Sequence, residues 1–430
     1  MSVEQDFEAS SSVYYRLFAW LSFGTMVATV FTITDNPSIE STGRIVFYMV
    51  ALSFMVGSGF FLLVDRELPP IRPAITALFL FFMMVNMIYA LAGLNTAALT
   101  FLAQYIIIFA SFFLFVRVGY HTNDRGAQIV AIGCLIVLVA YAAIAIARPS
   151  LSAGEGWTGG LGNQNLFGMG VLMLSSVAAV FLSLKLKGPP PRLAILAFAA
   201  VTFLLIYYSK SRSCLIALGV FYATYFGWRF LTRWRVMSTS FFLLLLAVIW
   251  YMTYSGAERI DLTGTIEQLL NSLSQGYGKN VDSGRSVIWN YALDSIGDHP
   301  ILGWGTSLTT TNILNNGLSF HSWYLTILYH FGIVGLTTYI AILYSIWRSF
   351  CAFGDSVYSR LGASALTSMM ITQAYEVSLT QNNLNIGLIY WTLFAFVLGR
   401  IARDRLLTVT QAAGSPFATP VLRFAVRSAA

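Results

Sequence analysis

Long apolar runs constrain this chain more than any other feature of its sequence. Each is about 20 residues long, enough for one helix to cross the ~30 Å hydrocarbon core of a bilayer. The sequence therefore predicts an all-α polytopic membrane protein with about twelve transmembrane helices. The predicted spans are residues 13–33, 44–64, 74–92, 97–116, 127–147, 165–184, 193–208, 212–228, 236–254, 321–347, 361–380 and 383–400.

The composition excludes other protein classes. Of the 430 residues, 57% are hydrophobic and 10% are charged, whereas a soluble domain has about 25% charged residues. So few charges cannot cover a water-facing surface of this size, which rules out a soluble enzyme and a disordered chain. The three cysteines are odd in number and show no disulfide framework or zinc-ligand spacing.

The basic residues predict the orientation of the chain. Its formal net charge is +7, from 25 Lys and Arg against 18 Asp and Glu. With a cytoplasmic N-terminus, roughly 18 of the 25 basic residues fall on the cytoplasmic side of the predicted spans, as the positive-inside rule requires. Both termini are thus expected in the cytoplasm. Because the N-terminus is acidic and polar, we do not expect it to be a cleavable signal peptide. The charge excess reflects this orientation and does not indicate nucleic-acid binding.

One connection is long enough to form a separate unit. Residues 255–320 join two spans on the external face, and loops of that length are usually functional or disordered. Two stretches, 262–273 and 285–298, have apolar residues at helical spacing, the second with Val287, Ile288, Tyr291 and Ile296 on one stripe. We expect a helical periplasmic cap, although two lid helices without chemistry are an alternative. The predicted organisation is helices 1–9 in 1–254, the loop in 255–320, helices 10–12 in 321–400 and a basic cytoplasmic tail in 401–430.

Soluble-enzyme motifs are absent from the sequence. It has no Walker loop, HExxH, CxxC, Rossmann glycine fingerprint or GxSxG, and no DxD-like metal-binding pair on the external face. Asp294 and Asp298 are one helical turn apart and are more simply explained as helix surface. If the protein is an enzyme, we expect it to work without a metal or cofactor and with cationic groups.

External cations are therefore the first candidate site residues. Arg212 and Lys210 lie in SKSRSC (209–214) between two apolar runs that are short for a bilayer. An arginine at that depth tends to face a protein cavity, unless it extends to the membrane surface. Arg285 follows Gly284 at a predicted helix start, which suits a phosphate, or it is a plain surface arginine. Arg259 is a less certain neighbour.

His321 is the candidate proton acceptor. It opens the tenth predicted span, where the external loop meets the membrane body, and histidine is the commonest general base; a capping or interfacial role is the alternative. Among the other histidines, His330 is expected to be packed, His299 to shape a turn before Pro300, and His121 to be cytoplasmic.

A carboxylate and several amides complete the candidate set. Glu376 lies near the outer end of the eleventh span, where a membrane-embedded carboxylate is a functional candidate by default; pairing with an external arginine explains it equally well. Asn163, Gln164 and Asn165, in GNQNLFG (162–168), lie at the outer mouth of the sixth span. They either bind sugar hydroxyls or cap the helix.

Four sequence elements, in the order in which they occur along the chain, resemble those of the O-antigen ligase and polymerase superfamily. They are GNQNLFG (162–168), SRS (211–213), GRSVIWNYALDSIGDHPILGWG (284–305) and HSWYLTILYHFGIVGL (321–336). The resemblance is strongest over residues 160–340. Its members are bacterial inner-membrane glycosyltransferases of the GT-C type, so it implies a GT-C-like fold. One difference is Ser322, where the family usually has asparagine after the histidine.

The resemblance also implies a substrate and residue roles. Members transfer a glycan from undecaprenyl diphosphate at the periplasmic face, either to lipid A–core (ligases) or to another lipid-linked repeat unit (polymerases). The family roles place Arg212 and Arg285 on the diphosphate and His321 on the acceptor hydroxyl. The expected partners are the lipid-linked donor, a glycan or lipid A–core acceptor, and membrane lipids.

Other functions remain as alternatives. We favour a ligase over an O-antigen or exopolysaccharide polymerase that joins lipid-linked repeat units. Both would use the same arginines and differ in the acceptor. A polysaccharide transporter would be expected to show internal repeats and broken helices around a midplane site, which the sequence does not indicate. A non-catalytic assembly scaffold is the third alternative. The sequence does not predict the oligomeric state.

Overall fold

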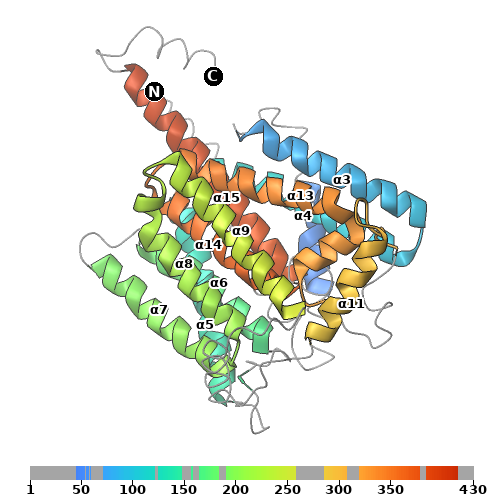
Figure 1. Ribbon diagram of the computed structural model, residues 1–430. Coiled ribbons are helices and arrows are strands. Elements are labelled where there is room, and N and C mark those ends of the chain that lie inside the picture. Colours follow the sequence, from blue (N-terminus) through green and yellow to red (C-terminus); the bar gives the residue numbers. More distant parts are fainter. Residues whose placement is uncertain are drawn as a thin grey trace.

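The computed structural model describes residues 45–53, 55–57, 59, 71–121, 124–147, 156–157, 164–183, 190–257, 285–307, 319–377 and 384–414. Within these ranges the chain is helical and contains no strand (Figure 1). The helices are α3 (Pro73–Gly93), α4 (Thr96–His121), α5 (Asp124–Ala147), α6 (Gln164–Ser183), α7 (Pro190–Ser209), α8 (Arg212–Leu231), α9 (Arg235–Ala257), α11 (Arg285–Asp298), α13 (Trp323–Ala352), α14 (Val357–Gln373) and α15 (Leu384–Gly414).

Length and composition confirm an all-α polytopic membrane protein. In the described part of the chain, seven helical segments are long and apolar enough to cross a membrane: α3, α4, α8 and α13, with Val130–Ala147 of α5, Arg235–Tyr254 of α9 and Ile386–Thr408 of α15. Shorter apolar helices lie within α6 and α7 and at Ile45–Gly57. The predicted span 13–33 lies outside the described residues, as do residues 44, 54, 58 and 60–64 of the predicted span 44–64.

Proline and serine set several helix starts. Pro73 and Pro190 begin α3 and α7, because proline has the helical φ and lacks the N–H that the first turn leaves unpaired. Ser356 caps α14 by accepting a hydrogen bond from the Ser359 N–H at 2.9 Å. α14 has 17 residues and packs along α8, while α6 packs against both α5 and α7.

Small residues let α4 and α15 pack closely. A Cβ added to Gly119 or Gly399 would collide with the backbone of the facing helix, at Phe396 and Val116 respectively. This close approach of two backbones is the packing that glycine permits between membrane helices. α15 therefore runs closely along α4.

α13 is broken at Gly332, although the sequence there predicts a continuous span. Gly332 has φ 60° and ψ −161°, a backbone conformation found essentially only in glycine. The preceding loop supplies partners for the backbone groups that the break leaves unpaired. The hydrogen bonds are Ile333 N to Pro300 O (2.9 Å), Val334 N to Ile301 O (3.2 Å), Trp304 N to Tyr329 O (2.9 Å) and Gly305 N to His330 O (2.9 Å). We call this pairing of residues 300–305 with 329–334 the interlock.

The exposed face of α11 differs from the predicted one. Ile288 and Ile296 are buried as expected, at 8% and 7% exposed, but Val287 and Tyr291 are 62% and 58% exposed. Trp289 and Ala292 are buried instead, and α11 packs against α9 and α13. The prediction for Val287 and Tyr291 was wrong because apolar spacing alone does not show which face meets a neighbour. The other predicted loop helix, 262–273, lies outside the described residues.

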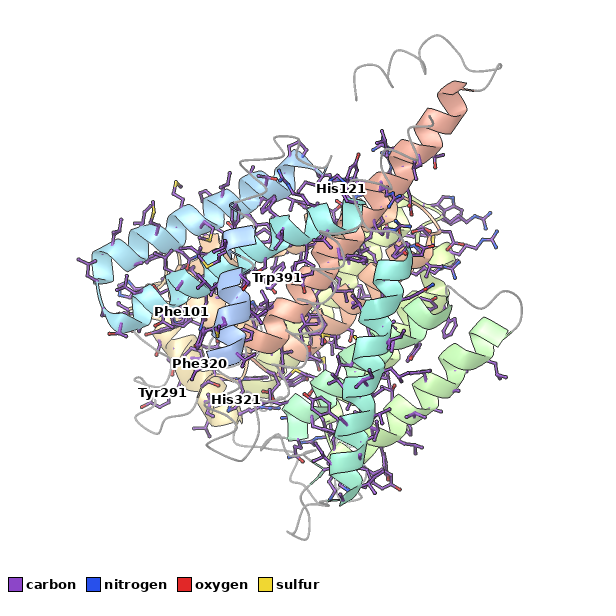
Figure 2. The ribbon with its side chains drawn as sticks, turned by 180° about the vertical axis from the view of Figure 1, so that it is seen from behind. Phe101, His121, Tyr291, Phe320, His321 and Trp391 are labelled. Carbon is purple, nitrogen blue, oxygen red and sulfur yellow. The ribbon has the colours of Figure 1, made fainter. Side chains whose placement is uncertain are left out.

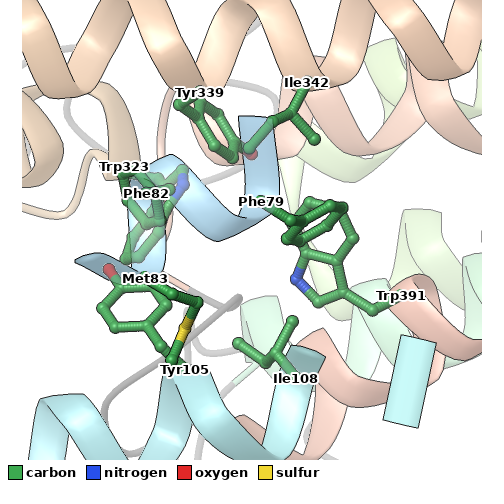
Figure 3. A pocket seen from close by; sticks show the side chains of 9 residues that line it. All are labelled: Phe79, Phe82, Met83, Tyr105, Ile108, Trp323, Tyr339, Ile342 and Trp391. Carbon is green, nitrogen blue, oxygen red and sulfur yellow. The ribbon is translucent and has the colours of Figure 1, made fainter. Parts of the chain in front are cut away.

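A small cavity lies between α3, α4, α13 and α15 (Figure 3). Its volume is about 20 Å³, and it is lined by apolar and aromatic side chains: Phe79, Phe82, Met83, Tyr105, Ile108, Trp323, Tyr339, Ile342 and Trp391. None of the candidate polar residues lines it. Trp323, two residues after His321, forms part of its wall, so this aromatic packing fixes the start of α13.

Candidate active site

Glu376 is the point where distant parts of the chain meet. It follows the C-terminal end of α14, where its backbone N–H binds the Thr372 carbonyl at 3.0 Å. The residue is only 5% exposed. A buried carboxylate requires compensating partners, and three other segments supply them.

Two partners contact the same carboxylate oxygen. Arg285 Nη2 lies 3.1 Å from Glu376 Oε1, and Asn165 Nδ2 donates a hydrogen bond to Oε1 at 2.7 Å. His321 Nδ1 lies 3.8 Å from the other oxygen, Oε2. The site therefore joins the start of α6, the start of α11, the segment just before α13 that carries His321, and the end of α14. We call Glu376, Arg285, Asn165 and His321 the carboxylate cluster.

Arg285 is the first residue of α11, as the sequence predicts. Its side chain is 25% exposed, so one part of the guanidinium is open while another binds Glu376. The guanidinium carbon also lies 5.7 Å from the centre of the Tyr375 ring, within the range of a cation–π contact. These two contacts from one short segment orient the charge at the N-terminus of α11, where the helix dipole also favours an anion.

His321 has an unusual backbone conformation. Its φ is 51°, a left-handed value that non-glycine residues adopt rarely and mostly at functional sites. Its side chain is 35% exposed. Trp289 of α11 donates its indole N–H to the Phe320 carbonyl at 2.7 Å, so α11 directly holds the residue before His321. Figure 2 shows His321 at one end of the bundle and His121 at the other.

Arg212 and Lys210 lie at the junction of α7 and α8. Arg212 is the first residue of α8, and Lys210 has φ 56°. Arg212 and Arg285 both lie within electrostatic range of the Tyr375 phenol. The structure therefore brings two predicted arginines near one aromatic residue, with Glu376 next to it in sequence.

The other predicted site residues have different outcomes. Arg259 and Asn163 lie outside the described residues. Asn165 donates a hydrogen bond to Glu376. Gln164 accepts a hydrogen bond from the Gly156 N–H at 3.2 Å and so holds the preceding loop. Two of the remaining histidines behave as predicted: His330 is 1% exposed, and the His299 carbonyl accepts a hydrogen bond from the Gly303 N–H in a turn. The cytoplasmic placement of His121 stays a prediction.

Sequence reasoning missed two supporting aromatic residues. Tyr375 lies against Arg285, and Trp289 connects α11 to the segment before His321. The available sequence signal was their position beside candidate residues: Trp289 lies in GRSVIW (284–289), and Tyr375 lies in AYE (374–376). Aromatic side chains are so frequent in this chain that their type alone could not single them out.

The site combines an anion-binding part and a proton-transfer part. Guanidinium groups bind phosphate oxygens with directed hydrogen bonds, and an imidazole paired with a carboxylate suits proton transfer. Both parts meet at Glu376. The described geometry thus supports transfer of a group from a phosphate leaving group to a hydroxyl.

A family model matches the middle of the chain. Residues 196–340 match the family model described as O-antigen ligase, and no curated protein matches the chain. The matched region begins within α7 and ends within α13. It contains Lys210, Arg212, Arg285 and His321, whereas Asn165 and Glu376 lie on either side of it. Residues 196–340, about a third of the chain, are thus similar to the O-antigen ligase family, which supports the resemblance to the O-antigen ligase and polymerase superfamily.

Proposed function

We propose that the protein is a metal-independent, inverting glycosyltransferase that moves a glycan from undecaprenyl diphosphate to a sugar hydroxyl. The observation that carries this proposal is the meeting of Arg285 and His321 on the two oxygens of Glu376. One residue suits the diphosphate and the other the hydroxyl. The match of residues 196–340 to the O-antigen ligase family model supports a lipid-linked glycan as substrate.

Arg212 and Arg285 would stabilise the leaving group. When a hydroxyl attacks the anomeric carbon, negative charge grows on the departing diphosphate. Fixed guanidinium groups favour that charge without reorganising during the reaction. In this proposal they perform the role that a bound metal ion performs in other transferases, with Lys210 and Arg259 as additional donor-binding cations.

His321 would take the proton from the attacking hydroxyl. Its side chain is partly exposed while Nδ1 faces Glu376, so the opposite edge of the ring is available to an acceptor. A single direct displacement inverts the anomeric centre. Asn163, Asn165 and Glu376 are proposed to line the glycan side of the site.

The proposed setting is the periplasmic face of the bacterial inner membrane, with both termini in the cytoplasm. The opposite placement of His321 and His121 along the bundle supports this orientation (Figure 2). We propose a GT-C-like arrangement, in which the 255–320 segment covers the glycan and a groove between spans holds the polyprenyl chain. We propose an O-antigen ligase that uses lipid A–core as acceptor.

Reconstitution with a defined lipid-linked glycan tests this proposal. Transfer to lipid A–core identifies a ligase, whereas a ladder of longer lipid-linked chains identifies a polymerase. Arg285→Ala and His321→Ala should each lower the transfer rate by about 100-fold or more. Arg360→Ala is the matched control, because Arg360 pairs with Asp355 beside the other end of α14. Full activity in both site variants would overturn the proposal.

A further inference from the structure

We propose that Glu376 is a positioning residue. When the donor diphosphate binds Arg285, the Glu376 carboxylate leaves Arg285 and binds His321 instead. The inference rests on the proposed function and adds a positioning role to the proposed place of Glu376 on the glycan side of the site. In the structure one oxygen of Glu376 is engaged and the other is not at hydrogen-bond distance from His321. His321 would thereby be oriented to accept a proton only when the donor diphosphate is present.

The first step of the argument is the uneven use of the two oxygens. Oε1 receives both Arg285 and Asn165, at 3.1 and 2.7 Å. Oε2 lies 3.8 Å from His321 Nδ1, beyond the usual upper limit of about 3.2 Å for an N–H···O hydrogen bond. While the carboxylate is bound to Arg285, its Oε2 is therefore too far from His321 Nδ1 for a hydrogen bond.

Competition for Arg285 provides the second step. A diphosphate carries more negative charge than a carboxylate and matches the planar guanidinium fork. When it binds Arg285, Glu376 loses part of its counter-charge and is repelled by the phosphate oxygens. Within the carboxylate cluster, the alternative hydrogen-bond donor is His321, whose Nδ1 at 3.8 Å from Oε2 lies about 0.6 Å beyond that limit.

The third step is the effect of that shift on His321. An Nδ1–H that donates to Oε2 fixes the ring and leaves Nε2 as the proton acceptor, and the carboxylate stabilises the imidazolium that forms. The acceptor O–H proton then moves to Nε2 while the acceptor oxygen bonds to the anomeric carbon. The bond from that carbon to the diphosphate breaks, and its electron pair leaves on the diphosphate.

Glu376→Gln separates this role from a merely structural one. Glutamine keeps the shape and loses the charge, so the diphosphate no longer competes with an anion. We expect farnesyl diphosphate, which carries no sugar to transfer, to inhibit this variant several-fold more strongly than the unsubstituted protein. At the same time kcat should fall at least tenfold, because His321 has lost its carboxylate. A structural defect alone would not tighten diphosphate binding.

Glu376→Asp supplies the second variant. It keeps the charge on a shorter side chain, so it should recover part of the kcat lost in Glu376→Gln while inhibition by farnesyl diphosphate stays near the original level. Thermal melting checks that each variant folds. If Glu376→Gln does not fold, Glu376→Asp alone decides: a normal kcat would overturn the inference, since the contact with His321 is then longer.

The outcomes distinguish this inference from the proposed function. If Arg285→Ala and His321→Ala retain transfer, the proposed function fails. If those variants lose transfer while Glu376→Gln keeps its kcat, only the present inference fails. It fails equally if Glu376→Gln weakens farnesyl diphosphate inhibition as Arg285→Ala does, because Glu376 then only supports the arginine.

Discussion

Arg285 illustrates how much of the site depends on one side chain with several neighbours. Its guanidinium reaches Glu376 at 3.1 Å and faces the Tyr375 ring at 5.7 Å. A planar, forked cation can make both contacts and still present N–H groups to a ligand. A residue of the same charge but different shape cannot, so charge and geometry can be tested separately at this position.

Arg285→Lys is expected to lower kcat/KM by roughly 10- to 100-fold. Lysine keeps the positive charge but loses the fork and the flat stacking face. Steady-state transfer assays with increasing donor concentration measure the effect, and Arg360→Lys provides a control. Unchanged kcat/KM in Arg285→Lys would mean that a point charge is sufficient.

Asn165→Ala is expected to reduce stability by about 1–3 kcal/mol. The substitution removes the 2.7 Å hydrogen bond to Glu376 Oε1 and leaves a buried carboxylate with one fewer donor. Asn165→Asp should be more destabilising, because it places a second carboxylate against the first. Denaturant unfolding in detergent measures both, and equal stability of the two variants would contradict this order.

At the scale of elements, the interlock explains why α13 is broken. The two halves of α13 need not share one hydrogen-bond ladder, because residues 300–305 pair with the free backbone groups at the break. The same loop begins directly after α11. The interlock therefore joins the helix that carries Arg285 to the half-helix that follows His321.

Gly332→Ala is expected to destabilise the fold by at least about 3 kcal/mol, from backbone strain together with a steric clash. An added Cβ would collide with the Ile301 carbonyl. Gly219→Ala in α8 is the matched control, since nothing lies within 4 Å of its added Cβ, and it should be neutral or stabilising by up to about 1 kcal/mol. Thermal melting in detergent compares them; similar melting temperatures would argue against the interlock.

The sequence predicted helices better than it predicted their contacts. Apolar runs near 20 residues placed α3, α4 and α9, because length and hydrophobicity are local properties. Arg285 and His321 were identified by their chemistry at loop boundaries, and the structure places them around Glu376. Their actual distances depend on packing between segments far apart in the chain, which periodicity does not encode. The break at Gly332 was missed for the same reason, since its partners lie in the preceding loop.

At the scale of the whole molecule, polar side chains gather at two ends of an apolar bundle. α11 lies at one end, and the C-terminal part of α15 projects at the other (Figure 1). There Arg400, 8% exposed, binds Asp124 at 2.7 Å, and the Tyr358 hydroxyl donates to the same aspartate at 2.8 Å. This second group ties the first residue of α5 to α14 and α15, far from the carboxylate cluster.

Asp124→Asn is expected to lower stability by about 1 kcal/mol without changing transfer kinetics. The aspartate side chain is 56% exposed, so solvent screens part of its attraction to Arg400. Melting temperature and kcat measured on the same preparation test the separation. A large loss of kcat at unchanged melting temperature would show that the two ends are coupled.

The chain separation of the residues around Glu376 has a consequence for biogenesis. Asn165 precedes Glu376 by 211 residues and Arg285 precedes it by 91. Because a ribosome makes the chain from its N-terminus, both partners leave the ribosome before the glutamate exists. A nascent chain therefore lacks the residue that joins the arginine to the histidine until α14 has been synthesised. Assembly of the candidate site is consequently a late event in translation, which delays the proposed transfer activity until most of the protein has been made.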